Sequence, residues 1–211
     1  MAPARRRGPR PRRRPSLDPA RDVLGTAGRL ELTLPTEVTS RLLDATNRLR
    51  CDAAELLLAG LVLAVSGWDR DRPGVLVEIE GHGRAESLLP GADLSRTVGW
   101  FTSLHPLLLP AGRDSDEVLT AVKERVRDVP DQGIGHGLLR HLNRTTGARL
   151  ARLARPDFGF NYLGRVSAAQ DGLWTSTADE GAALDEQDPA TPLSHAVALD
   201  AVVLDGEDGP A

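Results

Sequence analysis

The stretch Val75-Leu76-Val77-Glu78-Ile79-Glu80-Gly81-His82-Gly83-Arg84 is the part of the sequence that best defines the expected fold. In its first half, the residue types alternate as expected of a β-strand, in which successive side chains point to opposite faces of the sheet. One face then carries Val75, Val77 and Ile79, and the other carries Leu76, Glu78 and Glu80. We therefore expect Glu80 to lie on the face opposite the hydrophobic layer.

The end of this strand brings chemically useful groups together. Glu80, His82 and Arg84 supply a carboxylate, an imidazole and a guanidinium within five residues, which suits proton transfer beside a carbonyl. Gly81 and Gly83 leave the carboxylate unshielded, so a ligand can approach closely. A strand end with solvated charges and a turn is the alternative, and the pattern alone favours it.

The segments before this strand predict one strand and two helices. Residues 29–34 alternate as a strand that stops at Pro35, and residues 36–50 have helical spacing. Asp52 and Glu55 form a capping-box pattern for a second helix through Val65. That helix is apolar nearly all round, so we expect it to be buried.

The segments after it predict a mixed order of helices and strands. We expect an extended segment over 98–109, a helix opened by Asp114 and Glu117 that ends near Pro130, and a Gly-rich link over 133–137. A short helix over 138–144 and strands over 158–163 and 196–204 follow, with one short strand, 173–176, in the loop-rich acidic stretch 164–192. Two consecutive helices argue against a regular parallel βαβ winding and for an α/β fold with a mixed sheet.

Length and composition fit one globular domain of 211 residues. Cys51 is the only cysteine, which excludes an internal disulfide and a cysteine-based metal site. The longest apolar run, 53–66, is too short to span a bilayer, and no apolar segment follows the N-terminal arginines. These features predict a cytoplasmic protein with no membrane partner and no metal site.

Basic residues are placed unevenly along the chain. Seven arginines lie between Arg5 and Arg14, and no Lys or Arg follows Arg165. Such a tail has the charge to bind RNA, a membrane surface or an acidic partner. The Arg-Pro-Gly composition and the single lysine, Lys123, favour instead a GC-rich coding bias in a linker. We expect residues 1–27 to be a disordered tail and expect no nucleic-acid partner.

Four successive motifs resemble the signature motifs of epimerisation domains of nonribosomal peptide synthetases. They are, in chain order, Glu80–Arg84 (EGHGR), Arg96–Ser103 (RTVGWFTS), Gly133–Arg140 (GIGHGLLR) and Phe160–Gly164 (FNYLG). Pro192–His195 (PLSH) is similar to a further element of that family. The EGHGR form favours epimerisation domains over the condensation domains that share their fold.

The resemblance implies a chloramphenicol-acetyltransferase-like fold with two lobes and a tunnel between them. Residues 28–211 then correspond to the C-terminal lobe, truncated at its end. Such domains epimerise L-aminoacyl or peptidyl thioesters in antibiotic biosynthesis and other secondary metabolism. The resemblance implies that the substrate is attached to the phosphopantetheine arm of a peptidyl carrier protein. The expected partner of this chain is therefore that carrier protein, and no cofactor is expected to bind the chain directly.

The resemblance also assigns roles to individual residues. Glu80 matches the glutamate that acts as general acid or base, and we expect it to be the catalytic residue. The expected substrate-binding residues are His82, Arg84, Trp100, Asn161 and Tyr162. Each also has a structural interpretation: a turn histidine, a loop-pairing arginine, a core tryptophan, and a buried amide and hydroxyl that are hydrogen-bonded. The glycines at 133, 135 and 137 have the wrong spacing for a phosphate loop.

The sequence departs from the family in its histidines. The N-terminal lobe of the family carries HHxxxDG, and this motif does not occur here; no two of the five histidines are adjacent. We therefore expect the chain to be inactive alone, whether it is one half of an enzyme completed by a complementary N-terminal lobe or a decayed remnant. A non-catalytic carrier-protein-binding or scaffold module is the alternative function.

Overall fold

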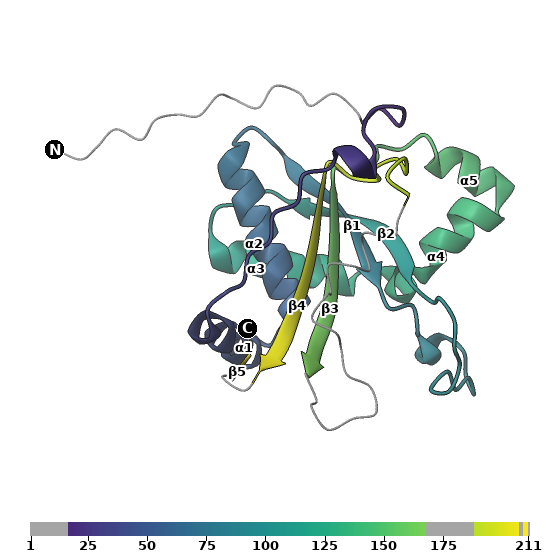
Figure 1. Ribbon diagram of the computed structural model, residues 1–211. Coiled ribbons are helices and arrows are strands. Elements are labelled where there is room, and N and C mark those ends of the chain that lie inside the picture. Colours follow the sequence, from purple (N-terminus) through teal and green to yellow (C-terminus); the bar gives the residue numbers. More distant parts are fainter. Residues whose placement is uncertain (1–16, 168–187, 207–208, 211) are drawn as a thin grey trace.

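The computed structural model describes residues 17–167, 188–206 and 209–210, and these form a mixed α/β unit (Figure 1). None of the described helices is long and apolar enough to cross a membrane. The α-helices are α1 (Thr36–Leu49), α2 (Ala53–Trp68), α3 (Ser115–Arg127), α4 (Ile134–Gly137) and α5 (Arg144–Leu150). The strands are β1 (Gly74–Gly81), β2 (Ser103–Pro110), β3 (Phe158–Ser167), β4 (Val197–Gly206) and β5 (Gly209–Pro210).

The strands form one sheet in the order β2-β1-β3-β4-β5. β1 pairs with β2 in the antiparallel sense and with β3 in the parallel sense, and β3 and β4 are also parallel. The sheet is therefore mixed, as the sequence predicts. β1 is therefore an interior strand, which pairs with β2 along its whole length and with β3 over Val77–Glu80.

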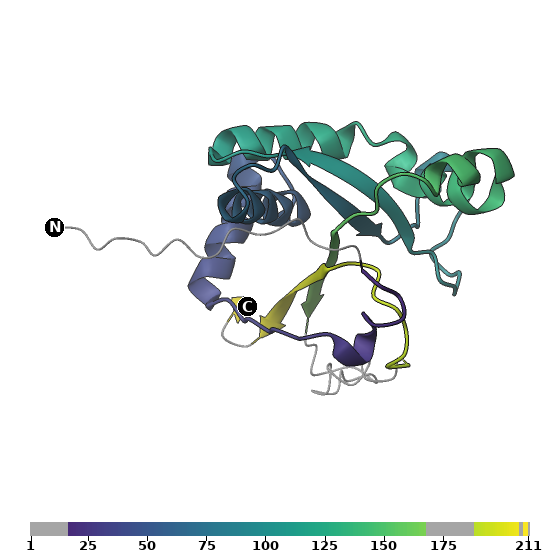
Figure 2. The same cartoon turned by 90° about the horizontal axis from the view of Figure 1, so that it is seen from above.

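The hydrophobic core lies between this sheet and helices α2 and α3. Val75 and Val77 of β1 have no exposed surface, and they pack with Val62 of α2 and Val122 of α3. The predicted capping box is present, because the Asp52 side chain accepts from the Glu55 amide at 2.7 Å while the Glu55 carboxylate accepts from the Asp52 amide at 3.0 Å. Figure 2 shows α4 and α5 as a second group, apart from the α2–α3 pair.

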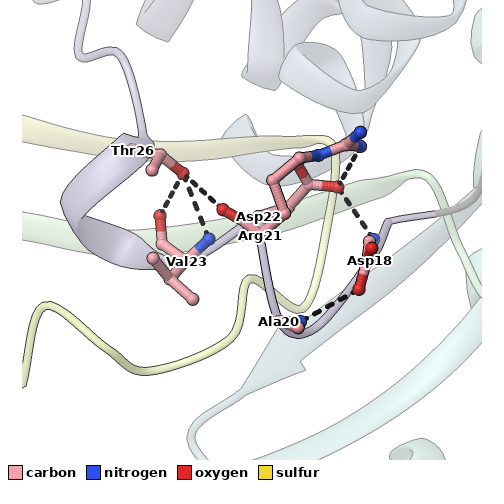
Figure 3. Close-up of polar contacts among 6 residues, drawn as sticks. All are labelled: Asp18, Ala20, Arg21, Asp22, Val23 and Thr26. Atoms are coloured by element: carbon pink, nitrogen blue, oxygen red, sulfur yellow. Dashed lines mark hydrogen bonds and ion pairs between the residues drawn. The ribbon is translucent and has the colours of Figure 1, made fainter.

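The expectation of disorder over residues 1–27 does not hold for its second part. Residues 1–16 lie outside the described residues, but residues 18–26 form a turn and a short 3₁₀ helix, Leu24–Thr26 (Figure 3). The Thr26 hydroxyl accepts from the Val23 amide and donates to the Val23 carbonyl. Backbone hydrogen bonds to Pro189 and Thr191 then attach this segment to the chain before β4. Those long-range partners have no signal in the local sequence.

Three other expectations need correction. Residues 29–34 form no strand, and Leu30 and Leu32 are 95% and 79% exposed. The Gly-rich segment expected as a link is helix α4, continued by a π-helix over Leu138–Leu142. Helix α5 was not expected; Asn143 caps it by accepting from the Thr145 and Thr146 amides. The expected strand at 173–176 lies outside the described residues.

The two glycines after Glu80 have different structural roles. Gly83 has a φ of +66°, and a Cβ atom on it would overlap the carbonyl oxygen of Phe101. Gly81 belongs to β1, and a Cβ atom there would lie 3.2 Å from the Ser103 hydroxyl, which can rotate away. Only Gly83 is therefore required by the backbone itself.

We expect Gly83→Ala to lower the free energy of unfolding by about 1–3 kcal/mol, because it adds both backbone strain and a clash with the main chain. Urea denaturation followed by circular dichroism measures this loss. Gly81→Ala is the matched control and should stay within about 1 kcal/mol of the original protein. Equal losses in the two variants would show that the turn does not depend on Gly83.

Candidate active site

Glu80 lies on the sheet face opposite the hydrophobic core, as the alternation predicts. Val75 and Val77 fill the core, while Glu78 and Glu80 face the other way and are half-buried. We call this second side, which carries Leu76, Glu78 and Glu80 of β1, the open face. A hollow of about 600 Å³ lies elsewhere, between the α1–α2 junction and the end of α3, and Glu80 does not line it.

The strand register places two polar residues of other strands beside Glu80. Glu80 is opposite Leu104 on β2 and Asn161 on β3, and Asn161 is in turn opposite Asp200 on β4. Partial burial raises the pKa of the Glu80 carboxyl, and the negative charges of Asp200 and Glu78 raise it further. A carboxylate with a raised pKa is a stronger base than a free one, as proton abstraction requires.

A second acidic residue of the open face is paired with a histidine. Glu78 Oε2 lies 3.0 Å from Nε2 of His195, and both side chains are mostly buried. The hydrogen bond from His195 lowers the pKa of Glu78, against the opposing effect of burial. Sequence reasoning did not identify Glu78, His195 or Asp200 as site residues. The alternation of β1 was a signal for Glu78, and the PLSH motif was a signal for His195, but neither pattern indicated that the two side chains meet.

His82 and Arg84 are bound within their own loop. The His82 Nδ1 atom accepts a hydrogen bond from the Arg84 amide at 3.0 Å. This contact agrees with the structural interpretation of His82 as a turn histidine. The Arg84 guanidinium donates to the carbonyls of Leu94 and Thr97 at 2.8 and 2.9 Å, and its centre lies 4.4 Å from the centroid of the Phe101 ring. Arg84 therefore holds the 85–101 loop through its guanidinium.

The other three expected site residues occupy different places. Asn161 lies next to Glu80 on the open face. Tyr162, one residue further along β3, packs against the core instead, and burial is the main cause that raises its pKa. Trp100 is 91% exposed, so its structural interpretation as a core tryptophan is wrong, while a role in substrate binding stays a prediction. The structure thus brings together Glu80 and Asn161, and separates both from Tyr162.

The chemistry available at this face is proton transfer by a carboxylate. Within the described ranges, no cluster of three or more His, Cys, Asp or Glu side chains could hold a metal ion. Glu80 has a raised pKa and stands beside an amide, Asn161, that can donate or accept hydrogen bonds. The face is open to solvent, so a substrate would have to be enclosed from the side opposite the core.

Comparisons with known proteins match this description. The model of the family described as "Condensation domain" matches residues 17–190. One component of the linear gramicidin synthase of Brevibacillus parabrevis is 40% identical over 72% of this chain, and bacitracin synthase 3 of Bacillus licheniformis is 34% identical over 88% of it. The chain spans only 2% and 3% of the lengths of these two relatives.

Solved structures give the same fold. The epimerization domain from the third module of tyrocidine synthetase B superposes with a TM-score of 0.70 and 28% identity, over 88% of this chain and 42% of that one. The X-domain from teicoplanin biosynthesis has a TM-score of 0.55 at 20% identity, which supports the fold alone. The neighbours share the chloramphenicol-acetyltransferase-like fold. With its mixed sheet, its open face and these matches, the chain belongs to the condensation-domain family of nonribosomal peptide synthetases.

Proposed function

We propose that this chain supplies the glutamate half of an epimerisation site, with Glu80 as the general acid or base. The observation that carries the proposal is the position of Glu80: it ends a core strand on the open face, and its pKa is raised by burial and by two neighbouring carboxylates. The likeness to the epimerization domain of tyrocidine synthetase B supports it. The substrate would be an L-aminoacyl or peptidyl thioester carried by the phosphopantetheine arm of a carrier protein.

The reaction needs a group on each side of the α-carbon. Glu80 would take the α-proton from one face of the thioester and leave an enolate, whose charge needs hydrogen-bond donors nearby. A single base tends to return the proton to the face it came from. An acid on the opposite side, such as the histidine of an HHxxxDG motif, would then complete the inversion, and this sequence contains no such motif.

The proposed second half is a complementary lobe that covers the open face. Leu104 and Leu108 of β2 share that face with Glu80 and are both exposed. Covering them would remove apolar surface from water and would enclose Glu80, which raises its basicity further. We propose that such a complex acts in the cytoplasm.

We expect the chain alone not to exchange the α-proton of a carrier-bound L-aminoacyl thioester, because Glu80 then lies on an open face without the enclosing lobe and the hydrogen-bond donors that the enolate needs. With a lobe that bears HHxxxDG supplied, deuterium from the solvent should enter the α-carbon. Glu80→Gln should reduce that rate by about 10²–10⁴-fold, the usual cost of removing a positioned proton-transfer group. Mass spectrometry of the released amino acid measures the exchange.

The control for that experiment is Glu124→Gln, the same change at an exposed position of α3 on the core side of the sheet. It should leave the exchange rate unchanged. Strong exchange by the isolated chain would show that this half removes the α-proton without a complementary lobe. Full exchange in the complemented Glu80→Gln protein would remove Glu80 from the mechanism, and carrier-protein binding without any exchange would favour the scaffold alternative.

We also expect the isolated chain to self-associate, because exposed apolar surface of this extent usually marks a partner site. The relevant side chains include Leu30, Leu32, Trp100, Leu104 and Leu108. Sedimentation velocity over a concentration series and binding of a hydrophobic dye measure this, and the complementary lobe should suppress both. A monomer at high concentration that binds no dye would contradict the expectation.

A further inference from the structure

His195 crosses over the sheet from the segment that precedes β4 and reaches a residue of β1. Its Nε2–H group donates to Glu78 Oε2 at 3.0 Å, although the two residues are 117 positions apart in the chain. The exposed fractions of the two side chains are only 15% and 22%. This contact, the His195–Glu78 pair, therefore connects the strand that carries Glu80 to the start of β4.

The sheet leaves space for the imidazole at Gly159 of β3. Gly159 stands opposite Glu78 on one side and Ala198 on the other. A Cβ atom at Gly159 would lie 2.7 Å from Nδ1 and 3.0 Å from Cε1 of His195, closer than atoms pack. Any larger residue would displace the ring, so this glycine allows the pair to form.

The pair is arranged to hold a charge. An ionised carboxylate can only accept hydrogen bonds, and His195 supplies one with Nε2. That nitrogen is then occupied by Glu78, and the ring lies against the backbone of Gly159. This leaves His195 poorly placed to exchange protons with a substrate, and it leaves Glu78 as a fixed negative charge.

We propose that the His195–Glu78 pair is a positioning element of the site, which fixes a carboxylate charge on the open face beside Glu80 and thereby strengthens Glu80 as a base. Side chains two residues apart on one strand face are about 7 Å apart, close enough for their charges to interact strongly where water is partly excluded. The catalytic consequence rests on the proposed function of Glu80, whereas the electrostatic coupling does not.

Several other groups act on the two glutamates. Asp200 of β4 adds a second negative charge beside Glu80. Around Glu78, the groups besides His195 are His136 of α4 and His105 of β2, which favour its ionised form when they are charged. Partial burial raises the pKa of Glu80 independently of Glu78, so we expect the removal of Glu78 to reverse only part of the effect.

The direct test is a titration of the whole chain with ¹³C-labelled glutamate carboxyls, followed by NMR. Glu78→Gln should increase the acid dissociation constant of Glu80 by about three- to tenfold, because the repulsive charge is gone. His195→Ala should raise the pKa of Glu78, and the two carboxyls should then titrate as a coupled pair. His195→Gln, which retains a donor of similar reach, should restore the low pKa of Glu78.

Three further variants separate this role from a structural one. Asp200→Asn should shift the titration of Glu80 in the same direction as Glu78→Gln, and Glu124→Gln should not shift it. Gly159→Ala should act like His195→Ala, because it displaces the ring without removing it. An unchanged Glu80 titration in Glu78→Gln overturns the proposal, as does an unchanged Glu78 titration in both His195→Ala and Gly159→Ala. If those two variants fail to fold, Glu78→Gln decides alone.

Exchange by the complemented protein tests the catalytic consequence separately. A base with a lower pKa loses its proton at lower pH but removes protons less readily, so Glu78→Gln should move the acid limb of the pH–rate profile to lower pH and reduce the plateau rate. If NMR shows the shift of Glu80 while the pH–rate profile stays fixed, the coupling stands and Glu80 is not the base. That outcome contradicts the proposed function alone.

Discussion

The fold depends on the burial of one face of β1, because successive side chains of this strand point into two different environments. Val75 and Val77 must be buried against α2 and α3, which fixes which face of the strand is apolar. Because the side-chain period of a strand is two, Glu78 and Glu80 are then placed on the other face. A slip of one residue in register would exchange the two sets. The hydrophobic core therefore holds the carboxylates in position without touching them.

Local patterns predicted the elements whose partners are close in sequence. The capping box at Asp52, the helix after Asp114 and the alternation of β1 all depend on residues within a few positions, and all three are present. The segment 29–34 also alternates, but alternation alone does not determine whether a segment pairs with a sheet edge, and this one forms no strand. The core interpretation of Trp100 was wrong for a related reason, since an apolar side chain does not reveal whether another surface will cover it.

The strand alternation predicted the face on which Glu80 lies. The motif singled out Asn161, and the sheet register places it opposite Glu80. Tyr162 was grouped with Asn161 because they are adjacent in sequence, yet adjacency on a strand places them on opposite faces. Arg84 has the positive charge expected of a residue that binds a substrate. Its guanidinium instead donates hydrogen bonds to two backbone carbonyls and lies over the Phe101 ring. The contact between Glu78 and His195 joins distant segments, and no local pattern encodes it.

The parallel pairing of β1 with β3 also has a consequence for synthesis on the ribosome. Val77 pairs with Phe158, so β1 gains its central neighbour only after about 80 more residues have been made. At about 5–20 residues per second, that interval lasts about 4–16 s. During this time β1 has only β2 beside it, and its other edge is free to pair with a different chain. Chaperone binding to the nascent chain would be most valuable in this interval.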